Sequence, residues 1–217
     1  MTTETLSGQR LATFGGPVPV KQAAGIIGAV AAIASRDVMR GALCGVHIES
    51  ENGDLILTAT DSYRLLSVTV PGVAGAAFDP VTVYAADLAR AAKNLGKGSA
   101  MLSISHVAGA TNHVTVAADS GSVTVPIVAG AFAHYRRLFD VPGDVWPAAT
   151  DSVRINAELF GGLLDSCAMI SGYADRPKDA PLTAVDIVRM SATKVTMITG
   201  TAANGVSFRG LIMPLRK

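Results

Sequence analysis

One pattern recurs along this 217-residue chain: an apolar helix followed by short strands with turn residues between them. Residues 20–35 are predicted to be the first helix, because Pro19 suits a first helical turn. Residues 85–95 are predicted to be the second, which ends at Gly96. The predicted strands are residues 42–48, 54–59 and 66–70 after the first helix, residues 81–84 before the second, and residues 101–105, 113–117 and 122–128 after it. A strong hairpin turn is predicted at Glu51-Asn52-Gly53-Asp54.

The pattern begins a third time near the C-terminal end. Asn156 is a predicted N-cap for a helix over residues 157–170. Strands are predicted at residues 153–156, 185–190, 194–199 and 207–213. Residues 139–151 contain Pro142, Gly143 and Pro147 and are typical of a linker, whereas residues 1–10 are polar and expected to be frayed. Stacked copies of one supersecondary unit bury a continuous core, so the chain is predicted to be an α+β protein built from three such units.

Composition limits the possible classes. Apolar residues make up 49% of the chain and charged residues 16%, which predicts a packed core. The net charge of +1 argues neither for nor against nucleic acid, so any such contact must come from local clusters of Lys and Arg. Cys44 and Cys167 lack a CxxC spacing and are expected to be buried free thiols in a reducing cytoplasm. The longest apolar stretch, residues 23–34, is well short of the roughly 20 residues that span a bilayer, so no membrane partner is expected.

The chain carries no arrangement of residues typical of a catalytic or metal-binding site. The histidines lie apart from one another and from any paired cysteines or carboxylates, which argues against a metal site. Gly96-Lys97-Gly98-Ser99 is superficially similar to a phosphate loop, but it follows a helix where a phosphate loop precedes one. No nucleophile elbow occurs. The sequence therefore predicts no enzyme, no metal and no cofactor.

Three segments carry a more specific signal. Ala59-Thr60-Asp61-Ser62-Tyr63-Arg64-Leu65 places a polar turn with a Tyr-Arg pair between two strands. By chemistry alone such a pair can bind peptides or phosphates, but it also occurs in ordinary hairpins. The others are Tyr135-Arg136-Arg137-Leu138 and the C-terminal Leu211-Ile212-Met213-Pro214-Leu215-Arg216. Together and in this order, they resemble segments of the bacterial DNA polymerase III beta subunit, the DNA sliding clamp.

The resemblance implies a DNA-clamp fold, with helices on one side and antiparallel sheets on the other. Residues 10–138 resemble the family's middle module, and residues 139–217 resemble part of its last module. The family's first module has no counterpart. This shortened form is similar to a clamp from a phage or another mobile element.

The resemblance also implies a cleft for short linear motifs of a polymerase and a clamp loader. Leu and Met would form an apolar floor, and the arginines would offer donors to a peptide. Taken singly, the apolar residues fit a core equally well and the arginines fit a solvated surface. Ala133 departs from the family's proline. The matching cleft residues are Leu43, Thr60, Ser62, Tyr63, Arg64, Leu65, Arg137, Leu138, Leu211, Met213, Pro214, Leu215 and Arg216.

DNA contact is the second implied property. In clamps, helices that line the hole offer basic side chains to phosphates, which binds double-stranded DNA without reading its sequence. Such basic stripes are also common on solvated helix faces. The third helix weakens a uniformly basic lining, because it carries only Glu158 and Asp165. The candidate DNA-binding residues are Lys21, Arg36, Arg40, Arg90, Lys93 and Lys97.

The function implied is a processivity factor that encircles duplex DNA as a homo-oligomeric ring and tethers a polymerase, acting in the cytoplasm after an ATP-driven loader places it on DNA. Family rings contain about twelve helix–strand units, so four chains of three units would complete one, and three chains would suffice if a fourth unit is hidden in the chain. The alternative is a clamp-like decoy that binds the motifs of polymerase or loader without encircling DNA.

Overall fold

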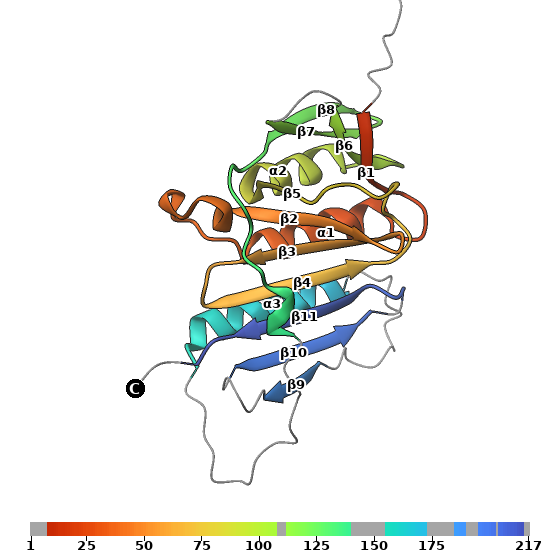
Figure 1. Ribbon diagram of the computed structural model, residues 1–217. Helices are drawn as coiled ribbons and strands as arrows, with labels where there is room; N and C mark the ends of the chain where they lie inside the picture. Colours follow the sequence, from red (N-terminus) through yellow and green to blue (C-terminus); the bar gives the residue numbers. More distant parts are fainter. Residues whose placement is uncertain are drawn as a thin grey trace, which may run out of the picture.

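Two antiparallel sheets with helices packed against them form the framework in the computed structural model, which describes residues 8–107, 112–139, 155–172, 185–189, 195–202 and 204–214 (Figure 1). This confirms the α+β class with repeated helix–strand units. The helices are α1 (Val20–Ala31), α2 (Ala85–Leu95) and α3 (Ala157–Gly172), with 3₁₀ turns η1 (Val38–Cys44) and η2 (Arg136–Leu138). The strands are β1 (Gly8–Phe14), β2 (Gly45–Glu51), β3 (Asp54–Thr60), β4 (Arg64–Val70), β5 (Val81–Tyr84), β6 (Leu102–Val107), β7 (His113–Ala118), β8 (Gly121–Pro126), β9 (Asp186–Arg189), β10 (Thr196–Thr201) and β11 (Ser207–Ile212).

The first two units exchange their leading strands. One sheet has the order β1-β6-β7-β8 and the other β5-β2-β3-β4-β11-β10-β9. Strand β1, which precedes α1, pairs with β6 of the second unit, and β5, which precedes α2, pairs with β2 of the first. Each unit is therefore a strand, a helix and three strands, and the exchange ties the two units together.

The third unit is attached through its last strand. Strand β11 pairs antiparallel with β4, so that Leu211 lies opposite Leu65 and Gly210 opposite Leu66. Helix α3 packs on the same face of this joint as α1 does on β3 and β4. At Gly210 a Cβ would lie 3.1 Å from a methyl group of Leu163, which explains how α3 approaches the strand so closely.

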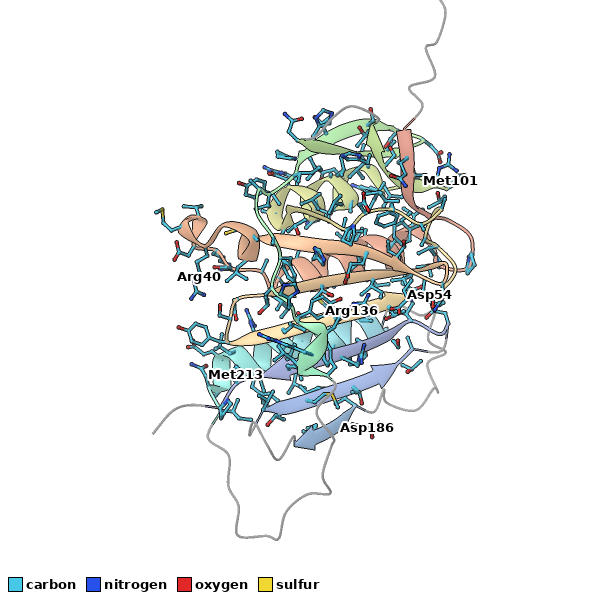
Figure 2. All side chains as sticks on the ribbon, in the orientation of Figure 1. Arg40, Asp54, Met101, Arg136, Asp186 and Met213 are labelled. Atoms are coloured by element: carbon cyan, nitrogen blue, oxygen red, sulfur yellow. The ribbon has the colours of Figure 1, made fainter. Side chains whose placement is uncertain are left out.

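The turn η1 projects from the sheets beyond the end of α1 (Figure 2, near Arg40). The predicted strand over residues 42–48 is wrong in its first part, since β2 begins at Gly45. The reason is local: the Asp37 side chain accepts a hydrogen bond from the Met39 N–H, and Gly41 takes a φ of 49° that suits glycine. Val38 and Met39 are 84% and 88% exposed at the tip of the projection.

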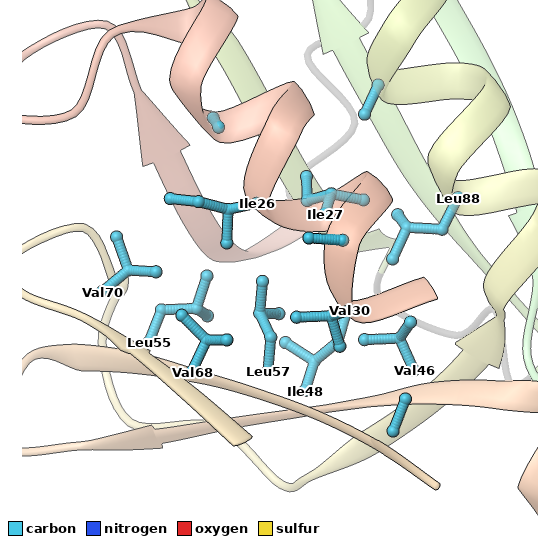
Figure 3. Close-up of a cluster of buried hydrophobic side chains, with 14 of the residues drawn as sticks. Ile26, Ile27, Val30, Val46, Ile48, Leu55, Leu57, Val68, Val70 and Leu88 are labelled. Atoms are coloured by element: carbon cyan, nitrogen blue, oxygen red, sulfur yellow. The ribbon is translucent and has the colours of Figure 1, made fainter. Parts of the chain in front are cut away.

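The core lies between the helices and the sheets (Figure 3). Ile26, Ile27 and Val30 of α1 are fully buried. Helix α1 is apolar along nearly its whole length and can therefore pack against the sheet and the neighbouring helices. The three side chains face apolar side chains of β2, β3 and β4 and Leu88 of α2 (Figure 3). Truncating one of these aliphatic side chains to alanine would destabilise the fold by about 2–5 kcal/mol.

Most predicted elements are confirmed, with shifts at their ends. Helix α2 has the predicted bounds, and the predicted cap holds α3, since the Leu159 N–H donates to the Asn156 side chain at 3.0 Å. Helix α1 ends at Ala31, one turn before the predicted Ser35. Fraying of residues 8–10 was a wrong expectation, because they belong to β1. The predicted strand over residues 153–156 and the linker over residues 139–151 fall largely outside the described residues.

Within the described ranges, none of the helices has the length and apolar character needed to span a membrane.

Candidate functional site

A small apolar cleft opens where the third unit joins the first. It is lined by the β3–β4 turn (Thr60, Ser62, Tyr63, Arg64, Leu65), by Leu138 of η2, and by Val195, Leu211 and Met213 of the third unit. Leu65, Val195 and Leu211 are buried and form its floor, whereas Tyr63, Leu138 and Met213 are 57%, 40% and 46% exposed at its rim. The cavity holds about 70 Å³, so it fits side chains of a short segment rather than a whole helix.

The β3–β4 turn is held rigid by its own side chains. The Asp61 carboxylate accepts hydrogen bonds from the backbone N–H groups of Tyr63 and Arg64, both at 2.9 Å. The Thr60 hydroxyl accepts from the Ser62 N–H, and Ser62 has a φ of 78°. These contacts explain why a polar turn can present Tyr63 at a defined place beside an apolar floor.

The Arg64 guanidinium forms its hydrogen bonds with groups of the protein itself. Its Nε donates to Asp61 at 3.0 Å, and its two terminal nitrogens donate to the carbonyl oxygens of Leu159 and Ala32, both at 3.4 Å. The side chain is 15% exposed. The guanidinium therefore connects the turn to α3 and to the residue that follows α1. These internal acceptors occupy the N–H groups of Arg64 that were expected to donate to a bound peptide.

Residues 127–139, here called the strap, form the third side of the cleft. In Figure 1 the strap (green) descends from β8 across the strands towards β11, on the opposite side of the sheet from α1 and α3. Phe132 and Tyr135 are buried against the sheet together with the cleft floor. The Arg209 guanidinium lies 4.3 Å from the centre of the Phe139 ring, which attaches the end of the strap to β11.

A polar cluster fastens the strap to β2. The His47 ring stacks on Phe132 with ring centres 4.6 Å apart, and its Nδ1 lies 2.9 Å from the Thr82 hydroxyl. The Tyr135 hydroxyl donates to Glu49, and Arg136 bridges Glu49 at 3.5 Å and Glu51 at 2.9 Å. Burial, and then the hydrogen bond to Glu49, raise the pKa of Tyr135, so the phenol remains a donor at neutral pH.

The structure brings together most residues predicted for the cleft, but not all. Leu43 lies in η1 and does not line the cleft, and Arg137 lines a separate groove of about 790 Å³ between the strap and strands β2 and β5. Pro214 follows Met213 without reaching the cavity, and Leu215 and Arg216 lie outside the described residues. Sequence reasoning missed Val195, although its alternation with Met197 in a predicted strand was a usable signal.

A second surface gathers basic side chains on the helices. Lys21 of α1 and Arg90, Lys93 and Lys97 in or just after α2 line a groove of about 950 Å³ along these two helices, which Met169 of α3 also lines. Small residues form its floor, among them Ala24, Gly25 and Gly28. These four basic residues are exposed. Arg90 also pairs with Asp87, one turn earlier on α2.

The other two predicted DNA-binding residues lie elsewhere. Arg36 is exposed just before η1 and does not line this groove. Arg40 donates to the Asp61 carbonyl oxygen at 2.6 Å, and its guanidinium lies 5.7 Å from the centre of the Tyr63 ring. Arg40 therefore belongs to the surroundings of the cleft rather than to the helix groove.

Metal-binding groups do not cluster in the part of the chain that the structure describes: no three His, Cys, Asp or Glu side chains lie close enough to hold an ion. Both cysteines are free thiols, and Cys167 is buried as predicted, whereas Cys44 is only half-buried. Burial raises the pKa of Cys167 to about 12, so this thiol stays protonated and unreactive.

Acid is expected to loosen the strap through His47. Burial lowers the pKa of His47 below its ordinary 6.5, Arg136 adds to this effect and Glu49 opposes it. The folded state thus binds a proton less readily than the unfolded chain, and stability is lost as pH falls below about 6.5 towards the lowered pKa. We expect the free energy of unfolding, measured in urea between pH 7.5 and 5, to fall less steeply for His47→Gln than for the wild type. The exposed His134→Gln is the control, and equal slopes for all three proteins would contradict the expectation.

Comparisons with known proteins point to one family. The sequence model described as DNA polymerase III beta subunit, central domain, matches residues 17–134, more than half of the chain. A search of curated proteins found no match.

Solved structures share the fold. The beta subunit of DNA polymerase III from Thermotoga maritima aligns with a TM-score of 0.70 at 11% identity, over 100% of this chain and 68% of that one. The subunit from Pseudomonas aeruginosa aligns with a TM-score of 0.66 at 14% identity, over 100% of this chain and 69% of that one. A beta sliding clamp of Caulobacter crescentus aligns with a TM-score of 0.59 at 18% identity, over 100% of this chain and 67% of that one. It was solved with polyethylene glycol at a region proposed to tether the beta motif. The chain therefore belongs to the family of the bacterial DNA polymerase III beta subunit and has the sliding-clamp fold.

Proposed function

We propose that the protein is a processivity factor that encircles duplex DNA and tethers a DNA polymerase through the cleft. The observation that carries this proposal is the cleft itself, because three segments far apart in the sequence converge on it. The action would be mechanical and would need no cofactor, with an ATP-driven loader supplied by another protein. The cytoplasm is where such a clamp would meet its polymerase. The division into a module at residues 10–138 and a shortened module at residues 139–217 is part of the proposal.

The cleft suits a short peptide with apolar anchors. Leu65, Val195 and Leu211 offer a buried, apolar floor, and the flexible Met213 at the rim can adapt to different side chains. Tyr63 offers a large aromatic surface that is already held in place by the turn. The Caulobacter clamp, which shares this fold, binds polyethylene glycol at a region proposed to tether the beta motif, and this supports such a role for the cleft.

Truncating the rim of the cleft should weaken peptide binding. We expect Tyr63→Ala and Met213→Ala each to reduce affinity about tenfold, roughly 1.4 kcal/mol, for fluorescent peptides that carry the clamp-binding motifs of a bacterial polymerase and clamp loader. Both side chains lie at the exposed rim, so their loss should leave the fold intact. Fluorescence anisotropy measures the affinity. Met101→Ala, which is 51% exposed and lies outside the cleft, is the matched control. Binding that is unaffected by either rim variant would place the peptide elsewhere.

A ring requires contacts between copies of the chain. In the described residues β8 pairs only with β7, has no charged side chain and exposes 45% of Val123. Uncharged strand edges of this kind readily pair with another chain. Strand β4, which occupies the corresponding last place in the first unit, already pairs with β11 across a unit boundary. This precedent supports pairing of β8 with the sheet of a neighbouring copy.

Self-association can be measured directly. We expect light scattering at micromolar protein to give the mass of a tetramer, or of a trimer if each chain supplies four units. Val123→Lys should shift the protein towards monomer, because the charge would be buried without a partner in the new sheet. Thr124→Lys is the comparison, because this exposed side chain lies on the other face of the strand. A wild-type protein that is monomeric over this range would rule out the ring.

The helix groove is the proposed DNA surface. Lys21, Arg90, Lys93 and Lys97 lie close enough together to contact successive phosphates, and Lys21 comes from a different helix than the other three. Contact with phosphates alone suits a protein that must move along any sequence.

Binding to DNA should depend on salt through these residues. We expect Lys93→Ala/Lys97→Ala to lower affinity for duplex DNA and to reduce the slope of log K against log salt by about 2, since each phosphate contact contributes about 0.9. Arg10→Ala, at an exposed position on β1, is the control.

Encirclement has its own test. After loading, the protein should stay on nicked circular DNA and leave once the DNA is made linear. Equal retention on both forms would contradict encirclement.

One observation favours the alternative of a peptide-binding decoy. Helix α3 exposes Glu158 and Asp165, which repel phosphates. A decoy would bind the polymerase and loader peptides but show no affinity for either form of DNA, so the peptide and DNA measurements together separate the two functions.

A further inference from the structure

We propose that Glu49, which lies outside the cleft, is a positioning residue that sets the cleft's third wall through Tyr135 and Arg136. This inference rests on the proposed peptide-binding function of the cleft. It concerns how the wall is held, and no residue of the network other than Leu138 needs to touch the peptide.

Leu138 is the part of the wall that most needs external support. It is the strap residue that lines the cleft, yet its side chain is 40% exposed. Its N–H donates to the Tyr135 carbonyl oxygen at 2.9 Å, and the Phe139 N–H donates to Arg136 at 2.9 Å. These bonds make η2 a single short 3₁₀ turn, which has little stability of its own. The position of Leu138 therefore follows that of Tyr135 and Arg136.

Glu49 holds both of these residues at once. One carboxylate oxygen accepts the Tyr135 hydroxyl, and the other accepts from Arg136. The Glu49 side chain is 13% exposed, whereas Glu51, the second partner of Arg136, is 52% exposed. Glu51 makes the shorter contact to Arg136, at 2.9 Å against 3.5 Å for Glu49. The restraint from Glu49 therefore acts mainly through the Tyr135 hydroxyl, because a hydrogen bond to a charged group is stronger where water is excluded. Figure 2 shows Arg136 in front of the strands, on the side where the strap lies.

The same carboxylate also lies near the middle of the strap, through His47. His47 Nε2 lies 3.8 Å from Glu49, and the His47 ring stacks on Phe132. Phe132 and Tyr135 remain packed on the sheet by their rings even if the polar contacts are lost. Their packing should keep the protein folded when the Glu49 charge is lost, while the Tyr135 hydroxyl and Arg136 are no longer fixed and η2 can shift along the sheet.

Glutamine at this position tests the idea, because it has nearly the same shape but cannot accept from both partners through two oxygens. We expect Glu49→Gln to weaken binding of the polymerase-motif peptide about tenfold, mostly through faster dissociation, with a small change in melting temperature. Glu49→Asp should give an intermediate value, since a shorter carboxylate keeps the charge. Glu51→Gln should have a smaller effect, and the exposed Glu158→Gln on α3 should have none.

A second variant and a second measurement distinguish a positioning role of Glu49 from a general loss of stability. Tyr135→Phe keeps the ring and removes only the hydroxyl, so it should weaken binding and be non-additive with Glu49→Gln in a double-mutant cycle. Hydrogen exchange at the Leu138 and Phe139 amides should accelerate in Glu49→Gln whether or not peptide is present. If the wild type binds no peptide but exchange still accelerates, the proposed function fails and the positioning role stands. Unchanged exchange together with unchanged affinity would overturn the positioning role.

Discussion

The pairing of β4 with β11 is the contact on which both the cleft and the packing of the third unit depend. It joins residues 64–69 to residues 207–212, strands that are far apart in the sequence, in one continuous ladder. The ladder continues one step further, because the Met213 N–H donates to the Tyr63 carbonyl oxygen at 2.8 Å. Without this pairing Leu65 and Leu211 would not meet, and the cleft would have no floor.

The two faces of the sheet carry different chemistry. Towards α1 and α3 the strands present aliphatic side chains, which bury well because both partners are apolar. On the other face, β2 presents His47, Glu49 and Glu51, and the strap supplies their partners. Polar side chains on an exposed strand face usually form their hydrogen bonds with water. Here they bond to the strap, the segment that completes the cleft.

The sequence predicts local features well and distant pairings poorly. Helix α2 and the Asn52-Gly53 hairpin depend on residues within one turn of each other, and both were predicted at their observed places. Strand β1 was missed because its partner, β6, lies about ninety residues later and its own residues are mixed in polarity. The bounds of η1 depend on one side-chain cap and one glycine, which a search for alternating apolar residues overlooks.

The same division holds for the candidate site. Thr60, Tyr63 and Leu65 could be predicted because they lie in one recognisable turn. The direction of Arg137 could not, since it depends on how the strap crosses the sheet, and neither could the acceptors of Arg64, which come from two other elements.

Those acceptors make Arg64 a mechanical link between the β3–β4 turn and the helices. Asp61, the Leu159 carbonyl and the Ala32 carbonyl hold the guanidinium from three directions, one in the turn and two in the helix layer. A segment seated against the turn would therefore pull on the helices and not on a loose loop. Any tension applied to such a tether would be spread through the interior of the molecule, and the turn would yield only if the layer behind it yielded too.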